Sequence, residues 1–150
     1  MNDQQAAVRL MQVAQGRTGA FEELHRNFYA DLRRFFTRVL WDDCMSERLT
    51  EEVFVKVWHG AGTFTANERV LIWILQLACS VLLSSPDVGC SSDVRERIVV
   101  ALTYQLKCCP EEIARITRSN VAHVKALLFS ALPKLGRGFE VNADRAARGA

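Results

Sequence analysis

The residues of this chain best suited to chemistry are five cysteines and three histidines. The cysteines show no Cys-x-x-Cys spacing and no histidine stands near them in ligand register, so the sequence predicts no metal site. In a cytosolic chain they are expected to be reduced thiols, although the adjacent pair Cys108 and Cys109 could sense oxidants or bind a soft metal. The residues concerned are Cys44, Cys79, Cys90, Cys108, Cys109, His25, His59 and His123.

Patterns typical of catalysis are also missing from the sequence. It contains no legible Ser-His-Asp set, paired carboxylates or glycine-rich phosphate loop. An enzyme is therefore the least favoured class of protein, and we expect neither a cofactor nor a small-molecule substrate.

The segment from Glu112 to Leu135 has the spacing of two short helices joined by a turn. Asn120 is a good N-cap for the second helix. The pattern predicts a helix-turn-helix, whose second helix commonly enters the major groove of DNA, although any packed helical hairpin would show the same periodicity. The apolar positions are Ile113, Ala114, Ile116, Val124, Leu128, Ala131 and Leu135.

Residues 112–135 resemble region 4, the promoter-reading region of extracytoplasmic-function sigma factors. That region has an E-I-A helix, a turn with glycine, then T-V-K-S-R-L and R-A-R-x-x-L. Further upstream, residues 20–24, 49–58 and 73–78 resemble region 2 of the same family, in the family's order. The positions in register with region 4 are Glu112, Ile113, Ala114, Val124, Lys125, Leu128, Ala131 and Leu135.

The resemblance implies that the helix carrying residues 49–58 docks on a helical coiled coil of the largest RNA polymerase subunit. Arg48, Glu51 and Glu52 stand where the family has Asp, Gln and Glu, so Arg48 reverses a charge. Like charges in an interface cost several kcal/mol, and we expect docking to be weakened in its usual form. An ordinary solvated helix face is the alternative. The residues assigned to docking are Arg48, Leu49, Glu51, Glu52 and Lys56.

The resemblance also implies that the loop over residues 60–67 helps to hold unstacked bases of the −10 promoter element. A plain interhelical loop is the alternative. Trp58, Phe64 and Trp73 could stack on bases, but core packing is favoured for Trp73. Residues 79–86 carry no positive charge where the family has basic residues, which predicts poor strand capture. The residues assigned to the −10 element are Gly60, Gly62, Thr63 and Asn67.

For the −35 element, the resemblance assigns residues of the second helix of the helix-turn-helix. Most family arginines are replaced there, and each lost phosphate contact weakens DNA binding. Leu127 and Phe129 stand where a DNA-reading face would be polar, which indicates a protein contact or a repacked core. Pro133 is expected to kink or end the helix. The residues assigned to the −35 element are Asn120, His123, Lys125 and Ser130.

The hydrophobic periodicity predicts an all-α protein of two small helical domains. We expect the first domain over residues 1–83, a linker over 84–92, the second domain over 93–138 and a disordered tail over 139–150. The first would hold a helix that ends near Gly16, followed by helices over 20–41, 46–58 with Ser46 as cap, and 67–83. The apolar stripe of the first helix is Val8, Leu10, Met11 and Val13. The apolar stripe of the helix over 20–41 is Phe21, Leu24, Phe28, Leu32, Phe35 and Val39. The second domain would hold helices over 93–107 and 111–135.

Charge and hydropathy fit a protein of the cytoplasm. The net charge is +2, and it is placed asymmetrically: −1 over residues 1–83 and +3 over residues 84–150. The second half is thus the better candidate for DNA binding. There is no signal peptide, and the apolar run from Val70 to Leu83 is too short to span a bilayer.

These observations predict an alternative sigma factor that binds core RNA polymerase and directs promoter-specific initiation. Its expected partners are core polymerase, promoter DNA and, as a further candidate, an anti-sigma factor. The second hypothesis is a sigma-like module that binds an anti-sigma factor or polymerase without reading promoter DNA.

Overall fold

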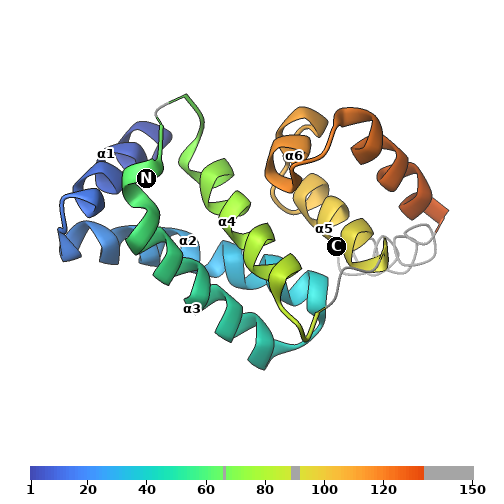
Figure 1. Ribbon diagram of the computed structural model, residues 1–150, viewed down its shortest axis with the longest axis horizontal. Helices are drawn as coiled ribbons and strands as arrows, with labels where there is room; N and C mark the ends of the chain where they lie inside the picture. The colour runs from blue at the N-terminus through green and yellow to red at the C-terminus, as the bar shows by residue number, and fades with distance from the viewer. Residues whose placement is uncertain (66, 89–91, 134–150) are drawn as a thin grey trace, which may run out of the picture.

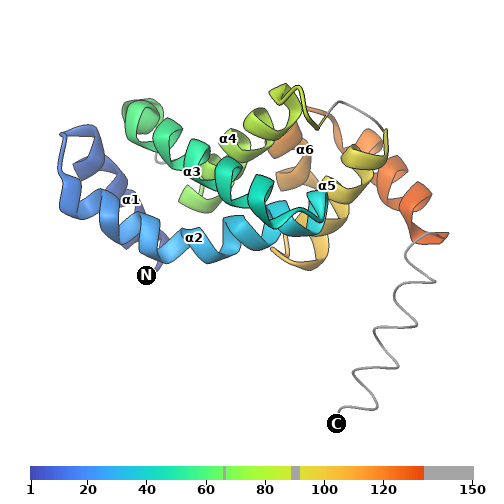
Figure 2. The same cartoon turned by 90° about the horizontal axis from the view of Figure 1, so that it is seen from below.

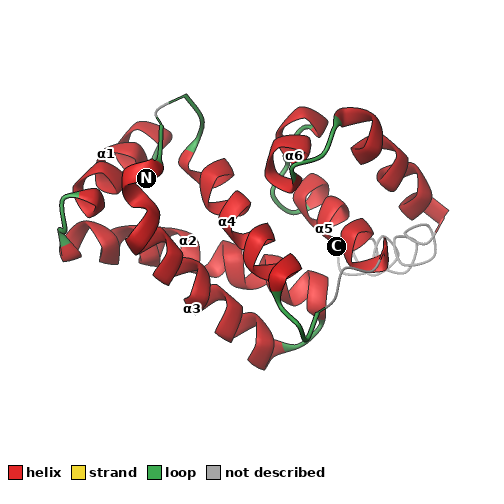
Figure 3. Ribbon diagram, viewed as in Figure 1, coloured by secondary structure: helices red, strands yellow, loops and turns green. Residues whose placement is uncertain are grey.

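The protein is all-α in the computed structural model, which describes residues 1–65, 67–88 and 92–133 (Figures 1 and 3). No strand occurs among these residues. The predicted fold class is confirmed. The elements are α1 (Asp3–Ala14), α2 (Thr18–Leu40), α3 (Asp43–Gly60), the 3-10 helix η1 (Ala61–Thr63), α4 (Val70–Ser84), α5 (Ser92–Tyr104), α6 (Pro110–Thr117) and a last helix over residues 121–133.

Helix boundaries in the first half follow local capping chemistry. A capping box begins α1, because the Asn2 side chain accepts from the Gln5 amide and Gln5 reaches back to the Asn2 amide. The predicted cap of α3 was wrong. Asp42 caps that helix by accepting from the Met45 amide at 3.0 Å, while Ser46 is buried and donates to the Asp42 carbonyl at 2.6 Å. The helix therefore begins three residues earlier than predicted.

The core of the first half is built from most of α4 and from one face each of α1, α2 and α3. The predicted α2 stripe is buried from Leu24 to Val39, with Phe21 half-buried at its start. On α1 the predicted stripe is only half right. Leu10 and Val13 are buried, but Val8 and Met11 are 50% and 60% exposed because they lie on the opposite side of the helix.

The helices of the two halves are separated at the predicted linker. Helix α4 ends at Ser84 and α5 begins at Ser92, so no helix runs through Pro86. Yet α5 packs against α2 and α6 packs against α4, and a single apolar cluster runs through both halves (Figures 1 and 2). That each half is a domain of its own stays a prediction. Residues 89–91 of the linker and all residues from Lys134 on, including the tail, lie outside the described residues.

Two helices joined by a short turn occupy the segment predicted to form a helix-turn-helix. Pro110 occupies the first turn of α6, and Asn120 caps the next helix by accepting from the His123 amide at 2.8 Å. That last helix includes Pro133, so it does not end before the proline as one predicted alternative had it. In both views it lies at the end of the molecule farthest from α1, with α5 and α6 between it and the first half (Figures 1 and 2).

Arg118 makes the turn between these two helices in a conformation that suits glycine. Its φ of 54° is left-handed, and its backbone N–H closes the end of α6 on the Ala114 and Arg115 carbonyls. We expect Arg118→Gly to raise the free energy of unfolding by about 0.5–1 kcal/mol, because glycine has no Cβ to strain there. Denaturant unfolding measures this. Arg118→Val should destabilise the protein, and a stabilising valine would contradict the strain argument.

Candidate functional site

The predicted docking helix α3 presents a regular stripe of exposed side chains. Arg48, Glu52, Val55 and His59 follow one another at spacings of four, three and four residues, so they share one face, and all are exposed. Glu51 and Lys56 are exposed on either side of the stripe. Of the five residues predicted for docking, four therefore reach the surface of the same helix.

Leu49, the fifth, does not lie on that surface. It is 1% exposed and belongs to the apolar core, where it holds α3 against the rest of the first half. Val55 was missed by sequence reasoning, although it is 56% exposed in the middle of the stripe. Its spacing of three residues from Glu52 was the signal that could have found it.

Arg48, the residue that reverses the family charge, is paired in this protein. Its Nη2 lies 3.1 Å from Oδ2 of Asp87, a residue of the segment after α4, and both side chains are more than half exposed. A carboxylate therefore stands beside the position where the family carries Asp. Such an exposed pair contributes little to stability, at most about 1 kcal/mol, but it does change the charge that α3 presents.

The residues predicted to hold −10 bases occupy two places. Gly60, Gly62 and Thr63 lie together at the end of α3 and in η1, where the Thr63 hydroxyl donates to the Gly60 carbonyl at 2.7 Å. Asn67 lies further along the loop and lines a groove described below. A Cβ at Gly62 would meet nothing within 4 Å, so this glycine leaves the backbone open to approach.

Aromatic rings next to this loop belong mainly to the core. Trp73 is 7% exposed and packs edge-on against Phe64, with ring centroids 5.8 Å apart. Trp58 is half-buried and packs edge-on against Phe21 at 5.4 Å. Trp73 is thus a core residue, as the favoured interpretation had it.

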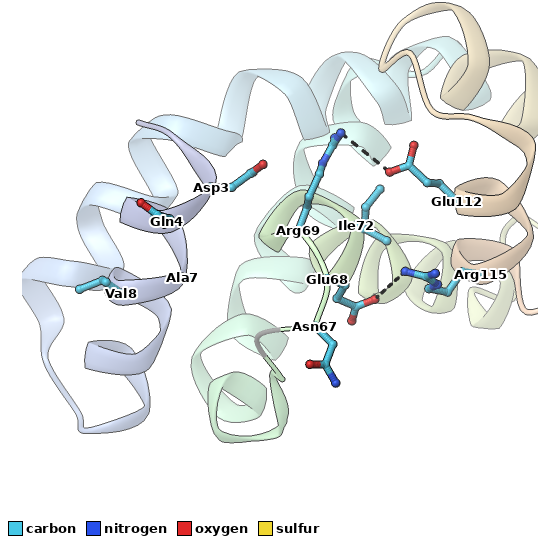
Figure 4. A pocket seen from close by; sticks show the side chains of 10 residues that line it. All are labelled: Asp3, Gln4, Ala7, Val8, Asn67, Glu68, Arg69, Ile72, Glu112 and Arg115. Carbon is cyan, nitrogen blue, oxygen red and sulfur yellow. Dashed lines mark ion pairs between the residues drawn. The ribbon is translucent and has the colours of Figure 1, made fainter.

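A groove of about 690 Å³ separates α1 from α6 and is floored by the start of α4 (Figure 4). Two ion pairs cross from the first half to α6. Arg69 lies 3.8 Å from Glu112, and Glu68 lies 3.9 Å from Arg115. Glu68 also accepts from the Gln76 amide group at 3.1 Å. The lining residues are Asp3, Gln4, Ala7, Val8, Asn67, Glu68, Arg69, Ile72, Glu112 and Arg115.

Glu112 is a charged carboxylate in this groove. Burial acts to raise its pKa, but the hydrogen bond from the Cys109 backbone, a further one from the Cys109 side chain and the charges of Arg69 and Arg115 outweigh burial and lower it. The first of these bonds, from the Cys109 amide at 3.1 Å, also caps α6. One side chain therefore both begins the helix-turn-helix and ties it to the first half.

In the last helix, the residues predicted for the −35 element differ in what their side chains do. Asn120 is occupied in capping the helix. Ser130 donates from its hydroxyl to Oε1 of Glu96 on α5 at 2.9 Å, so it joins two helices of the protein. His123 and Lys125 are exposed. Lys125 and His123 are thus the two predicted residues with side chains directed to solvent rather than used within the fold.

The outward face of the last helix is apolar. Ala122, Ala126, Phe129 and Pro133 share one side of it and are exposed, with Phe129 at 77%. Leu132 is 49% exposed nearby. Leu127 does not belong to this face, because it is half-buried against the core and lines a small hollow with Arg95 and Thr117. Of Leu127 and Phe129, only Phe129 is therefore exposed.

Two of the described cysteines, Cys79 and Cys108, are buried, whereas Cys44 and Cys109 are exposed. Burial raises the pKa of Cys79 to about 12, with Cys108 adding to the effect, and burial raises that of Cys108 to about 11. Both thus stay protonated thiols at neutral pH, which disfavours oxidation and metal binding. Within residues 1–65, 67–88 and 92–133 no group of three His, Cys, Asp or Glu side chains could hold a metal ion. In the same ranges, no helix is long and apolar enough to cross a membrane.

Comparison with known proteins places these features in a family context. No family profile matches the chain. It is 33% identical over 72 residues to the extracytoplasmic-function RNA polymerase sigma factor SigK of Mycobacterium sp. strain KMS, and equally to that of strain JLS. The matched segment spans 47% of this chain and 37% of those relatives, so the chain matches only about a third of their length.

A solved structure extends the similarity to the whole fold. CnrH, solved in complex with the cytosolic domain of CnrY, superposes with a TM-score of 0.74 at 16% identity. The superposition covers 91% of this chain and 98% of the CnrH chain. The local sequence match, the order of the helices and the helix-turn-helix at the end agree, and they identify the chain as a divergent relative of the extracytoplasmic-function sigma factors.

Proposed function

We propose that this protein is a sigma factor that binds core RNA polymerase through α3 and directs initiation at its own promoters in the cytoplasm. The observation that carries the proposal is the fold shared with CnrH over 91% of the chain, combined with the exposed stripe on α3. Two neighbouring exposed carboxylates of that helix, on Glu51 and Glu52, give this face an acidic surface suited to a basic partner.

Binding to purified core polymerase tests the proposal. The full chain, labelled at its N-terminus, should show saturable binding in fluorescence anisotropy, and binding should weaken as salt is raised because the interface is charged. Absence of binding at low salt would contradict the docking proposal.

The Arg48–Asp87 pair gives a sharper test of the same surface. An unpaired Arg48 would face a basic partner, so Asp87→Ala should weaken polymerase binding by roughly three- to tenfold, equivalent to about 1 kcal/mol. Arg48→Ala alone should not weaken it, and the double variant Arg48→Ala, Asp87→Ala should bind at least as well as the parent. If all three variants bind equally, the pair plays no part in docking.

A second candidate function rests on the outward face of the last helix. That face carries Ala122, Ala126 and Phe129 where DNA reading calls for polar side chains, and it suits a protein partner better than a major groove. By analogy with CnrH, which was solved with the cytosolic domain of CnrY, an anti-sigma segment is the partner we propose for this alternative.

Two substitutions separate the candidates. If the last helix binds DNA, Lys125→Ala should lower the salt slope of binding by about one unit and Phe129→Ser should change little. If it binds a protein, Phe129→Ser should be the harmful change, at a cost on the order of 2 kcal/mol. Both side chains are exposed, so neither result would reflect unfolding.

A further inference from the structure

Trp41 is the least expected residue on the surface of this protein. Its side chain is 77% exposed, and its backbone is left-handed, with φ of 56°, at the C-terminal end of α2. A bulky residue in this conformation costs about 1–2 kcal/mol relative to glycine. Neither burial nor backbone geometry explains a tryptophan here, and strained residues of this kind concentrate at functional positions.

Arg97 of α5 holds one face of the Trp41 ring. Its guanidinium carbon lies 4.7 Å from the ring centroid, and its Nη1 donates to the Val39 carbonyl at 3.3 Å. The hydrogen bond to Val39 holds the guanidinium at the C-terminal end of α2, where the helix carbonyls attract positive charge. The indole is thus backed by a fixed cation, and its large exposed fraction leaves the opposite face open.

Two further arginines continue this surface along α2. Arg34 and Arg38 are exposed, and at seven and three residues before Trp41 they lie on one side of the helix, within about 60°. No hydrogen bond or ion pair joins either guanidinium to another described residue. Arg34, Arg38, Trp41 and Arg97, which we call the Trp41 platform, therefore combine three cations with one open aromatic face.

The composition of the platform favours nucleic acid over protein. The centre of a protein interface is apolar and depleted of charge, whereas Trp41 is bordered by the three arginines of the platform and by the exposed carboxylates of Asp42 and Asp43. Single-stranded nucleic acid matches this composition, because its phosphates can pair with the guanidinium groups and its unstacked bases can stack on the indole ring. Duplex DNA fits less well, because its bases are already stacked.

We propose that the Trp41 platform binds single-stranded DNA by stacking a base on Trp41 and pairing phosphates with Arg34 and Arg38. The surface lies at the C-terminal end of α2 and on α5, at the opposite end of the first half from η1 (Figures 1 and 2). Because the assay below contains no polymerase, its outcome is independent of whether the chain docks on polymerase.

The test is a titration of the full chain with an oligodeoxythymidylate of about twelve nucleotides at low salt, within the usual site size of such surfaces. Bases stacking on Trp41 should quench tryptophan fluorescence, since Trp73 is buried and Trp58 half-buried. Trp41→Ala should remove the quenching and lower the affinity roughly five- to hundredfold, and Trp41→Phe should retain most of the affinity. Arg34→Gln and Arg38→Gln should each lower the salt slope by about 0.7.

Arg26→Gln is the matched control, because Arg26 is exposed on the same helix about 80° around from Arg34 and the change in net charge is identical. It should leave the salt slope unchanged. Absence of oligonucleotide binding, or an affinity that survives Trp41→Ala, would overturn the proposal. So would equal quenching by poly-L-glutamate, which would assign the platform to an acidic protein.

Discussion

Replacing Glu52 with lysine should lower the affinity of this protein for core RNA polymerase at least tenfold. Glu52 is exposed in the centre of the α3 stripe, between Arg48 and Val55. Reversing its charge would place a cation against a basic partner, and a like-charge contact in an interface costs several kcal/mol. Anisotropy of the labelled chain with purified core enzyme, at two salt concentrations, measures the loss.

Glu47→Lys is the control for Glu52→Lys. It makes the same charge change on the same helix, but Glu47 lies about 140° around the helix axis from Glu52 and is also exposed. Its effect should be small and should disappear at moderate salt. Equal losses from both variants would show that net charge, rather than a docking surface on α3, controls binding.

Shortening Leu102 to alanine should destabilise the whole protein by about 2–5 kcal/mol, the usual cost of removing a buried leucine side chain. Leu102 is fully buried on α5, the helix that packs on α2 of the first half and on α6 of the second. We expect thermal unfolding to remain one transition, moved down by roughly 5–20 °C. Circular dichroism with a calorimetric scan measures it.

Phe129→Ala provides the comparison for Leu102→Ala, since it removes a larger apolar side chain that is 77% exposed. That variant should change stability by no more than about 0.5 kcal/mol. Two separate transitions, with only one shifted by Leu102→Ala, would mean that the halves unfold as independent domains.

Helices with strong hydrophobic periodicity could be predicted from the sequence, because burying one face of a helix requires apolar residues at regular spacing. The α2 stripe from Leu24 to Val39 and the apolar α4 are where the spacing placed them. The helix-turn-helix was equally legible, since Pro110 and Asn120 mark its helix starts by local chemistry. At the start of α3 the predicted cap, Ser46, was wrong, because Asp42 caps the helix instead. Only the structure shows that Ser46 turns inward.

The side chains of the candidate site were harder to predict, because their roles depend on partners distant in sequence. Ser130 donates a hydrogen bond to Glu96, 34 residues away in the sequence, and Arg48 pairs with Asp87, 39 residues away. Sequence spacing holds no information on such pairs. Leu127 and Phe129 are different: they lie about 200° apart around a helix, so the periodicity itself could have separated the half-buried residue from the exposed one.

Transcription by purified core polymerase, with and without this protein, on fragments of the native genome tests the central claim most directly. A sigma factor should produce transcripts from discrete start sites that share two short upstream elements, and Glu52→Lys should reduce them. Transcripts no different from those of core polymerase alone, from a protein that binds the enzyme, would contradict promoter-specific initiation and favour the interaction module.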